Sequence, residues 1–190
     1  AIPMKILYGV QGTGNGHISR ARALNRELTS LGADIDFIFS GRQAKDYFGL
    51  EEFPNRKLFH GLHLAYAHGK VDVLQTWHKN NLPLIYSEIN ALNTRQYDLV
   101  ISDFEPITAW AAKLQHTPCL TLGHQYAFKH AIPKADDNIL NRQLLKAVAP
   151  SVVALGLHWY HFDQPILPPI IHHLSSTAAE QGYFLVYLPF

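Results

Sequence analysis

The 190 residues correspond to one domain or slightly more, and this length is sufficient to bury a core without disulfides or metals. With 47% apolar and 16% charged residues, the composition is globular and excludes an intrinsically disordered chain. Sixteen Lys and Arg against fifteen Asp and Glu give a net charge of +1, and no basic stripe indicates a nucleic-acid partner.

The first forty residues predict a strand, a glycine-rich loop, a helix and a second strand. Residues 5–10 form a short apolar run that indicates a buried strand, and glycines dominate residues 12–16. The helix is indicated by apolar residues at helical spacing, namely Ala21, Leu24, Leu28 and Leu31. Its other face is expected to carry Arg20, Arg22, Arg26 and Glu27. Gly32 ends the helix, residues 35–39 form the next strand, and the whole is a βαβ unit.

The same alternation continues to residue 157. Further strands are expected near residues 57–60, 98–102, 118–122 and 151–157. Helices are expected over residues 71–93, from Pro106 onward, and around Leu140, Leu144 and Val148. Pro83 must kink or split the first of them. Strands that alternate with helices predict an α/β fold, a Rossmann-like parallel sheet with helices on both faces.

The last thirty residues have a different character. Pro165, Pro168 and Pro169 favour a linker over residues 163–182, and residues 183–188 then form a clear strand pattern. We therefore expect a domain over residues 4–162, a linker over 163–182, and over 183–190 the first strand of a second domain that lies beyond the chain. An exposed terminal strand could also pair with a second copy and form a homodimer.

The loop Gly12-Thr13-Gly14-Asn15-Gly16 is the most informative local feature. Glycines allow close approach of a ligand, and the start of the following helix offers free N–H groups to a phosphate, carboxylate or sugar hydroxyl. A P-loop is excluded because no lysine follows the glycines. A dinucleotide-binding loop fits poorly, because His17 replaces the third glycine and Ser40, not an acid, ends the second strand.

Together with His17, this loop resembles the G-G-T-G-G-H loop of GT-B glycosyltransferases, in the group that contains the peptidoglycan lipid-intermediate N-acetylglucosaminyltransferase and the diacylglycerol glycosyltransferases. The segments 98–106 and 118–125 resemble the corresponding strands and polar loops of that group. The residues 166–171 and 183–190 resemble its interdomain crossing and the first strand of its second domain, in an uncharacterised branch.

The resemblance implies one half of a two-domain GT-B fold, the N-terminal half that mainly binds the acceptor. The implied reaction is hexosyl transfer from a nucleotide diphosphate-sugar to an acceptor hydroxyl, without a metal or other cofactor. The donor site would lie mostly in the second domain, so the isolated chain is expected to be inactive. The acceptor would be a lipid or a saccharide.

Three residues are candidates for catalysis. His17 matches the histidine of the family loop and can accept a proton near neutral pH, although it can equally cap its own helix or order the loop. Asp103 and Glu105 follow a predicted strand at its carboxyl end, where open α/β sheets place their ligands. Either acid can act as the base or orient His17, and capping of the helix that begins at Pro106 is the alternative.

Substrate-binding groups are expected in two loops. The first is the glycine loop, with Gly12, Thr13, Gly14, Asn15 and Gly16. His124 and Gln125 follow the next predicted strand at the same edge of the sheet and are candidates for acceptor binding, with an ordinary polar loop as the alternative. No set of His, Asp and Glu residues has the spacing of a zinc site, and the single cysteine, Cys119, excludes a cysteine cluster.

A cytoplasmic protein is expected, and a lipid acceptor would place it at the inner membrane face. The single cysteine fits a reducing compartment, and no apolar run reaches the roughly 18–20 residues of a membrane span. Two other functions remain open. One is a non-catalytic module or partner subunit that binds a sugar or nucleotide, and the other is a nucleotide-sugar epimerase of GT-B architecture. A dinucleotide-dependent dehydrogenase ranks behind both.

Overall fold

The computed structural model of the chain describes residues 3–67, 70–133, 143 and 146–171. Within these residues a seven-stranded sheet runs in the order β3-β2-β1-β6-β7-β8-β9. All of its strand pairs are parallel. The strands are β1 (Lys5–Gln11), β2 (Asp34–Ser40), β3 (Arg56–Leu58), β6 (Leu99–Asp103), β7 (Cys119–Gly123), β8 (Val153–Leu157) and β9 (Ile166–Leu167).

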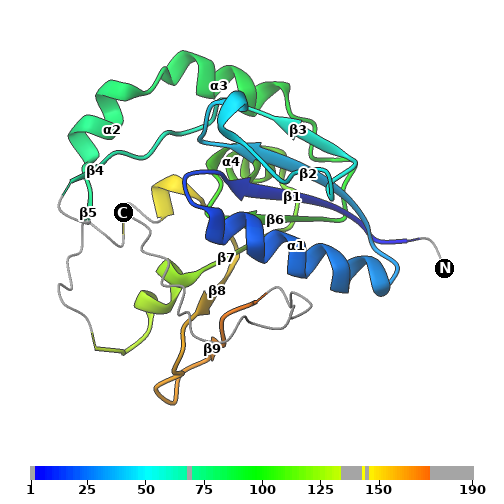
Figure 1. The fold of residues 1–190 in the computed structure, drawn as a ribbon, viewed down its shortest axis with the longest axis vertical. Helices are drawn as coiled ribbons and strands as arrows, with labels where there is room; N and C mark the ends of the chain where they lie inside the picture. The colour runs from blue at the N-terminus through cyan, green and yellow to red at the C-terminus, as the bar shows by residue number, and fades with distance from the viewer. Residues whose placement is uncertain (1–2, 68–69, 134–142, 144–145, 172–190) are drawn as a thin grey trace, which may run out of the picture.

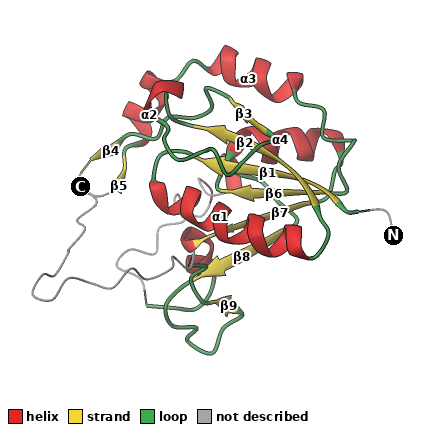
Figure 2. Ribbon diagram, turned by 45° about the vertical axis from the view of Figure 1, so that its right-hand side comes forward, coloured by secondary structure: helices red, strands yellow, loops and turns green. Residues whose placement is uncertain are grey.

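Helices cover both faces of this sheet (Figures 1 and 2). On one face α1 (Asn15–Ser30) packs Ile18 and Ala21 onto a cluster of aromatic strand residues that includes Tyr8, Phe37 and Phe39. On the other face α3 (Leu82–Ala91) and α4 (Pro106–Gln115) pack against Leu7 and Val100 and their neighbours. The predicted α/β fold, a Rossmann-like parallel sheet between two helical layers, is therefore confirmed.

The stretch predicted as helical over residues 71–93 begins at the end of a strand and contains two separate helices. A short antiparallel pair, β4 (Tyr66–Ala67) and β5 (Lys70–Val71), comes first, followed by α2 (Val73–Lys79) and α3. Asn81 caps α3 by accepting a hydrogen bond from the backbone N–H of Leu84 at 3.1 Å. Pro83 lies in the first turn of α3, where its missing N–H is no loss, so the split at this proline is confirmed.

At the end of α1, the position of Gly32 agrees with the sequence prediction, whereas the exposure of Leu31 does not. Gly32 has a φ of +89° and follows the helix as the predicted left-handed terminator. Leu31, expected on the apolar face, is 83% exposed, because the helix already ends at Ser30 and Leu31 is its C-cap. The core contacts of α1 therefore stop one turn earlier than the apolar spacing predicts.

The C-terminal part of the chain is described only in places. Strand β9 lies inside the range predicted as a linker and pairs with β8, so the sheet extends into this range. The helix predicted around Leu140 and Leu144 falls largely outside the described residues, although Val148 is helical and buried. The strand predicted over residues 183–188, and with it the dimer contact, also lies outside them.

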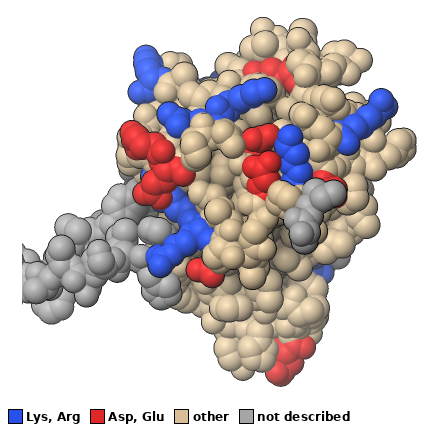
Figure 3. Space-filling view, turned by 90° about the vertical axis from the view of Figure 1, so that its right-hand side faces the viewer, with Lys and Arg blue, Asp and Glu red and all other residues tan. Residues whose placement is uncertain are grey.

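The surface bears charges of both signs. On the face in Figure 3, acidic and basic groups are interspersed rather than gathered into one field, in keeping with the net charge of +1. Among the described helices, none is long and apolar enough to cross a membrane.

Candidate functional site

Because the sheet is parallel, the carboxyl ends of its strands meet at one edge, where such folds place their ligands. The glycine loop follows β1 at this edge, and β6 ends there at Asp103. The segment after β3 folds over the same edge, since Gln11 Nε2 donates to the carbonyl oxygen of Leu62 at 2.9 Å. Residues far apart in the sequence therefore converge at the start of α1.

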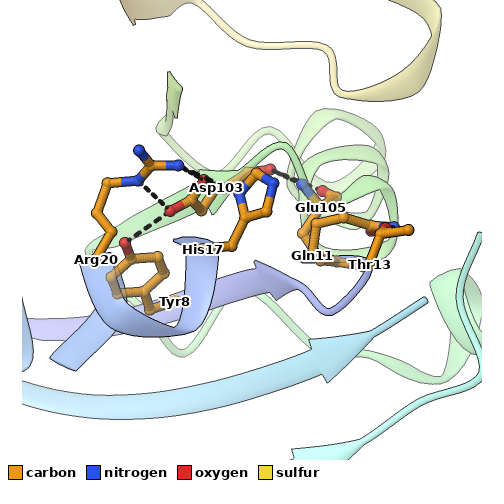
Figure 4. A network of polar contacts seen from close by, with 8 residues as sticks. Tyr8, Gln11, Thr13, His17, Arg20, Asp103 and Glu105 are labelled. Atoms are coloured by element: carbon orange, nitrogen blue, oxygen red, sulfur yellow. Dashed lines mark hydrogen bonds and ion pairs between the residues drawn. The ribbon is translucent and has the colours of Figure 1, made fainter. Parts of the chain in front are cut away.

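His17 and Asp103 form the centre of the site (Figure 4). Nδ1 of His17 lies 2.7 Å from Oδ1 of Asp103, whose side chain is completely buried. An ionised carboxylate can only accept hydrogen bonds, so Nδ1 carries the proton and donates it to Asp103. In the described part of the chain Nε2 has no hydrogen-bond partner, and the His17 side chain is 16% exposed. The ring of His17 is therefore anchored through Nδ1, and the described chain leaves its Nε2 unengaged.

Two further side chains surround the Asp103 carboxylate. Arg20 donates from Nε to Oδ2 at 2.7 Å and from Nη2 to Oδ1 at 2.9 Å, and the Tyr8 hydroxyl lies 3.4 Å from Oδ2. Burial acts to raise the pKa of Asp103, but the contacts with His17 and Arg20 outweigh it and hold this pKa below its ordinary value. Asp103 is thus an anion at neutral pH despite its burial.

Arg20 corrects the sequence prediction for α1. It was expected on the solvent face of the helix, but its side chain is only 14% exposed, because Asp103 pairs with it. Arg20 and Tyr8 were both missed as members of the site. The signal for Arg20 was its position three residues after His17, which places both side chains on the same face of a helix. Tyr8, in the middle of an apolar strand, gave no such signal.

The glycine loop leaves the N-terminus of α1 uncovered. Gly14 is the N-cap residue, no side chain caps the helix, and the first turn contains no acidic residue. A Cβ atom at Gly16 would meet nothing within 4 Å, and one at Gly14 would only touch the ring of His17. Free N–H groups and the partial positive charge of the helix therefore remain available to an oxygen-rich ligand beside His17.

Gly12 has a different role from the other glycines of the loop. Its N–H donates to the carbonyl oxygen of Ser40 at 2.6 Å, and a Cβ atom at this position would overlap the hydroxyl of Tyr47. Gly12 therefore allows the loop to pack against the segment after β2, whereas Gly14 and Gly16 face open space.

This difference predicts opposite effects of alanine at Gly12 and Gly16. G12A should lower the free energy of unfolding by about 1–3 kcal/mol, because the Tyr47 ring has to move. G16A should leave it unchanged or raise it by up to about 1 kcal/mol, since Gly16 is helical and unobstructed. Urea denaturation of the two variants tests this, and equal effects would contradict the assigned packing of Gly12.

Glu105 is the N-cap of α4. Its carboxylate accepts hydrogen bonds from the Ser40 hydroxyl at 2.6 Å, from the backbone N–H groups of Ile107 and Thr108, and from the Thr108 hydroxyl. Its side chain is completely buried, and burial raises the pKa of Glu105 while the Ser40 and Thr108 hydrogen bonds oppose the shift. With both oxygens occupied by the protein, the structure favours the capping alternative for this residue.

The residue between the two acids explains why their environments differ. Phe104 has a φ of +56°, which is unusual for a side chain of this size, and it is buried against Tyr126. This left-handed residue turns the chain sharply between the end of β6 and the start of α4. Asp103 consequently contacts α1, whereas Glu105 points back into its own helix.

His124 and Gln125 lie two strands away from β1, at the start of the 3₁₀ helix η2 (His124–Lys129). His124 is exposed, its Nδ1 lies 3.0 Å from the carbonyl oxygen of Leu157, and its ring stacks on that of His158. Gln125 has a buried Oε1 that finds no partner in the described chain. Both residues lie at the predicted edge of the sheet, and the stacking on His158 was not foreseen from the sequence.

Three or more His, Cys, Asp or Glu side chains do not come together as a metal site anywhere in the described ranges. Cys119 is buried, and this burial raises the pKa of its thiol to about 12, so the thiol is not a nucleophile at neutral pH. The side chains of His17, Asp103 and Arg20 thus gather at this edge beside the open start of α1.

Comparison with known proteins identifies a family and several similar folds. Residues 4–188 match the family model described as "Glycosyl transferase family 1". No curated protein matches the chain significantly. Acinetobacter baumannii MurG superimposes with a TM-score of 0.51 and 16% identity over 90% of this chain and 47% of MurG. The glycosyltransferase SnogD from Streptomyces nogalater superimposes with a TM-score of 0.50 and 11% identity, over 94% of this chain and 54% of SnogD.

These superpositions show a shared fold, and the chain spans about half the length of each of the two proteins. The family match covers nearly all of the sequence, including the glycine loop, Asp103 and the strands that carry them. The chain therefore belongs to the family described as "Glycosyl transferase family 1".

Proposed function

We propose that the protein transfers a hexosyl unit from a nucleotide diphosphate-sugar to an acceptor hydroxyl, and that this chain supplies the acceptor side of the site. The observation that carries the proposal is the 2.7 Å contact between His17 and the buried Asp103, next to the uncapped start of α1. An imidazole held by a carboxylate through one nitrogen and free at the other is the arrangement of a general base.

His17 acts as the base in this reaction. Nε2 takes the proton of the acceptor hydroxyl while the acceptor oxygen bonds to the anomeric carbon of the donor. The bond from that carbon to the diphosphate breaks, and the nucleoside diphosphate leaves with the electron pair. Asp103 stabilises the imidazolium that forms, and His17 later returns the proton to solvent. Asp103 is the orienting acid, and Glu105 serves as the helix cap.

The glycine loop positions the ligands around this base. The free N–H groups at the start of α1 offer hydrogen bonds to diphosphate or sugar oxygens, and the helix favours negative charge at this end. This stabilisation of the leaving diphosphate needs no metal. Thr13 and Asn15 border the same opening, and the Thr13 hydroxyl accepts a hydrogen bond from Gln11 at 2.6 Å.

The acceptor is a lipid or a saccharide, and His124 and Gln125 are the groups we assign to it. The exposed ring of His124 supports this role, and Gln125 is its neighbour at the start of η2. A lipid acceptor would bring the protein to the inner face of a membrane, and the apolar side chains of Leu82, Leu84 and Tyr86 exposed on α3 suit such a surface.

The test is turnover by the natural full-length protein with labelled nucleotide-sugars, each offered with a lipid extract, with soluble saccharides and with no acceptor. Transfer of label into either acceptor pool, with release of the nucleoside diphosphate, is the expected result. Conversion into a different nucleotide-sugar without acceptor would indicate an epimerase. Binding of the nucleotide-sugar without any conversion would indicate a non-catalytic module.

A further inference from the structure

Arg20 contacts both oxygens of the Asp103 carboxylate. Its planar guanidinium donates two hydrogen bonds to Asp103, from Nε at 2.7 Å and from Nη2 at 2.9 Å. The side chain is 14% exposed, and it stands one turn after His17 on α1. Its Nη2 also lies 3.3 Å from Nδ1 of His17, so the two residues meet at the same carboxylate oxygen.

The Asp103 carboxylate is held by four donors, two for each oxygen. Oδ1 accepts from Nδ1 of His17 and from Nη2 of Arg20. Oδ2 accepts from Nε of Arg20 and lies 3.4 Å from the hydroxyl of Tyr8. Rotation of the carboxylate would break both bonds to Arg20 at once. Without Arg20, the weak contact with Tyr8 would be the only one left on Oδ2.

The type of residue matters at this position. The guanidinium fork matches the two oxygens of a carboxylate and fixes their plane, whereas a lysine supplies a point charge that leaves the plane free. The charge of Arg20 also balances that of the buried Asp103. His17 therefore pairs with a carboxylate whose orientation is set by a second residue on the same helix.

We propose that Arg20 is a positioning residue, which fixes the Asp103 carboxylate so that Nδ1 of His17 stays protonated and Nε2 stays free to accept a proton. This inference rests on the proposed function of His17 as the base. It assigns to Arg20 an indirect control of the imidazole tautomer, exerted through the orientation of Asp103, which goes beyond simple stabilisation of the fold.

The test is the tautomer of His17 in this chain, read from long-range ¹H–¹⁵N spectra of the imidazole at about pH 8.5, where an ordinary imidazole is neutral. Wild type should show the Nδ1–H form, with a hydrogen-bonded, slowly exchanging proton. R20M should lose this protected proton and populate the Nε2–H form. R20K should lie between the two, and R26M, at an exposed arginine of the same helix, should match wild type.

Wild-type imidazole spectra in R20M and R20K would overturn the proposal. If R20M fails to fold, the spectrum of R20K alone tests the proposal, because lysine keeps the positive charge but lacks the two-pronged guanidinium. In the full-length enzyme, R20M should lower kcat by about 10–100-fold, with a smaller change in the KM of the donor. Full activity of the full-length H17A variant would refute the proposed function, while an altered tautomer in R20M would still establish the action of Arg20 on His17.

Discussion

Replacement of His17 by alanine in the full-length protein is expected to lower kcat by about 10²–10⁴-fold, the usual contribution of a general base. Nε2 of His17 is the free nitrogen beside the open helix start, and alanine leaves no proton acceptor at that point. The proposed function places most donor contacts in a second domain, so the KM of the donor should change little. Steady-state kinetics with saturating acceptor measure both quantities.

The matched control for this variant is H116N. His116 caps the C-terminus of α4 with a φ of +59°, at the opposite edge of the sheet, and asparagine tolerates that conformation. H116N should keep wild-type turnover. A kcat of H17A within about threefold of the wild-type value would show that His17 is not the general base, because loss of a general base has a much larger effect.

Replacement of Asp103 by alanine is expected to destabilise the fold by about 3–5 kcal/mol. Asp103 is completely buried, and its removal leaves the guanidinium of Arg20 without this partner. The Arg20 side chain is itself only 14% exposed. Nδ1 of His17 loses its acceptor in the same step. Urea denaturation of the chain measures the loss, and D163N, at a side chain that is 92% exposed, should change stability by less than about 0.5 kcal/mol.

The stabilisation by Asp103 should also depend on pH. The pKa of Asp103 is held below its ordinary value in the folded chain, so the folded state binds its proton less readily than the unfolded state. This stabilisation is fully present above the ordinary carboxyl pKa and is lost as the pH falls through the folded value. The difference in unfolding free energy between wild type and D103N should therefore shrink below about pH 4. A difference that stays constant into the acid range would contradict the ion pair.

Much of the sheet could be predicted from the sequence, because its central strands are mostly buried and read as apolar runs. Residues 5–10, 35–39 and 98–102 match β1, β2 and β6 to within one or two residues. The edge strand β9 has only two residues and lies in a proline-rich segment, so no pattern marks it. The strand pair β4 and β5 is equally short and was not predicted, and its last residue, Val71, was expected to begin a helix.

The clustering of the candidate residues could be predicted from the sequence, but their individual contacts could not. The carboxyl ends of parallel strands placed His17, Asp103 and Glu105 at one edge. Which acid contacts His17 depends on the left-handed turn at Phe104, and a sequence does not reveal a positive φ at a phenylalanine. The burial of Arg20 likewise follows from its pairing with Asp103 across 83 residues of chain.

The central claim is that His17 and Asp103 act as one unit, and a double-mutant cycle on the full-length enzyme tests it most directly. D103N keeps the shape of the side chain but removes the charge that holds the proton on Nδ1. If Asp103 acts through His17, then H17A combined with D103N should be no slower than H17A alone, because groups that act as a unit are not additive. If the fold-decrease in kcat of the double variant equals the product of the two single decreases, the residues act independently, and this result would contradict the account.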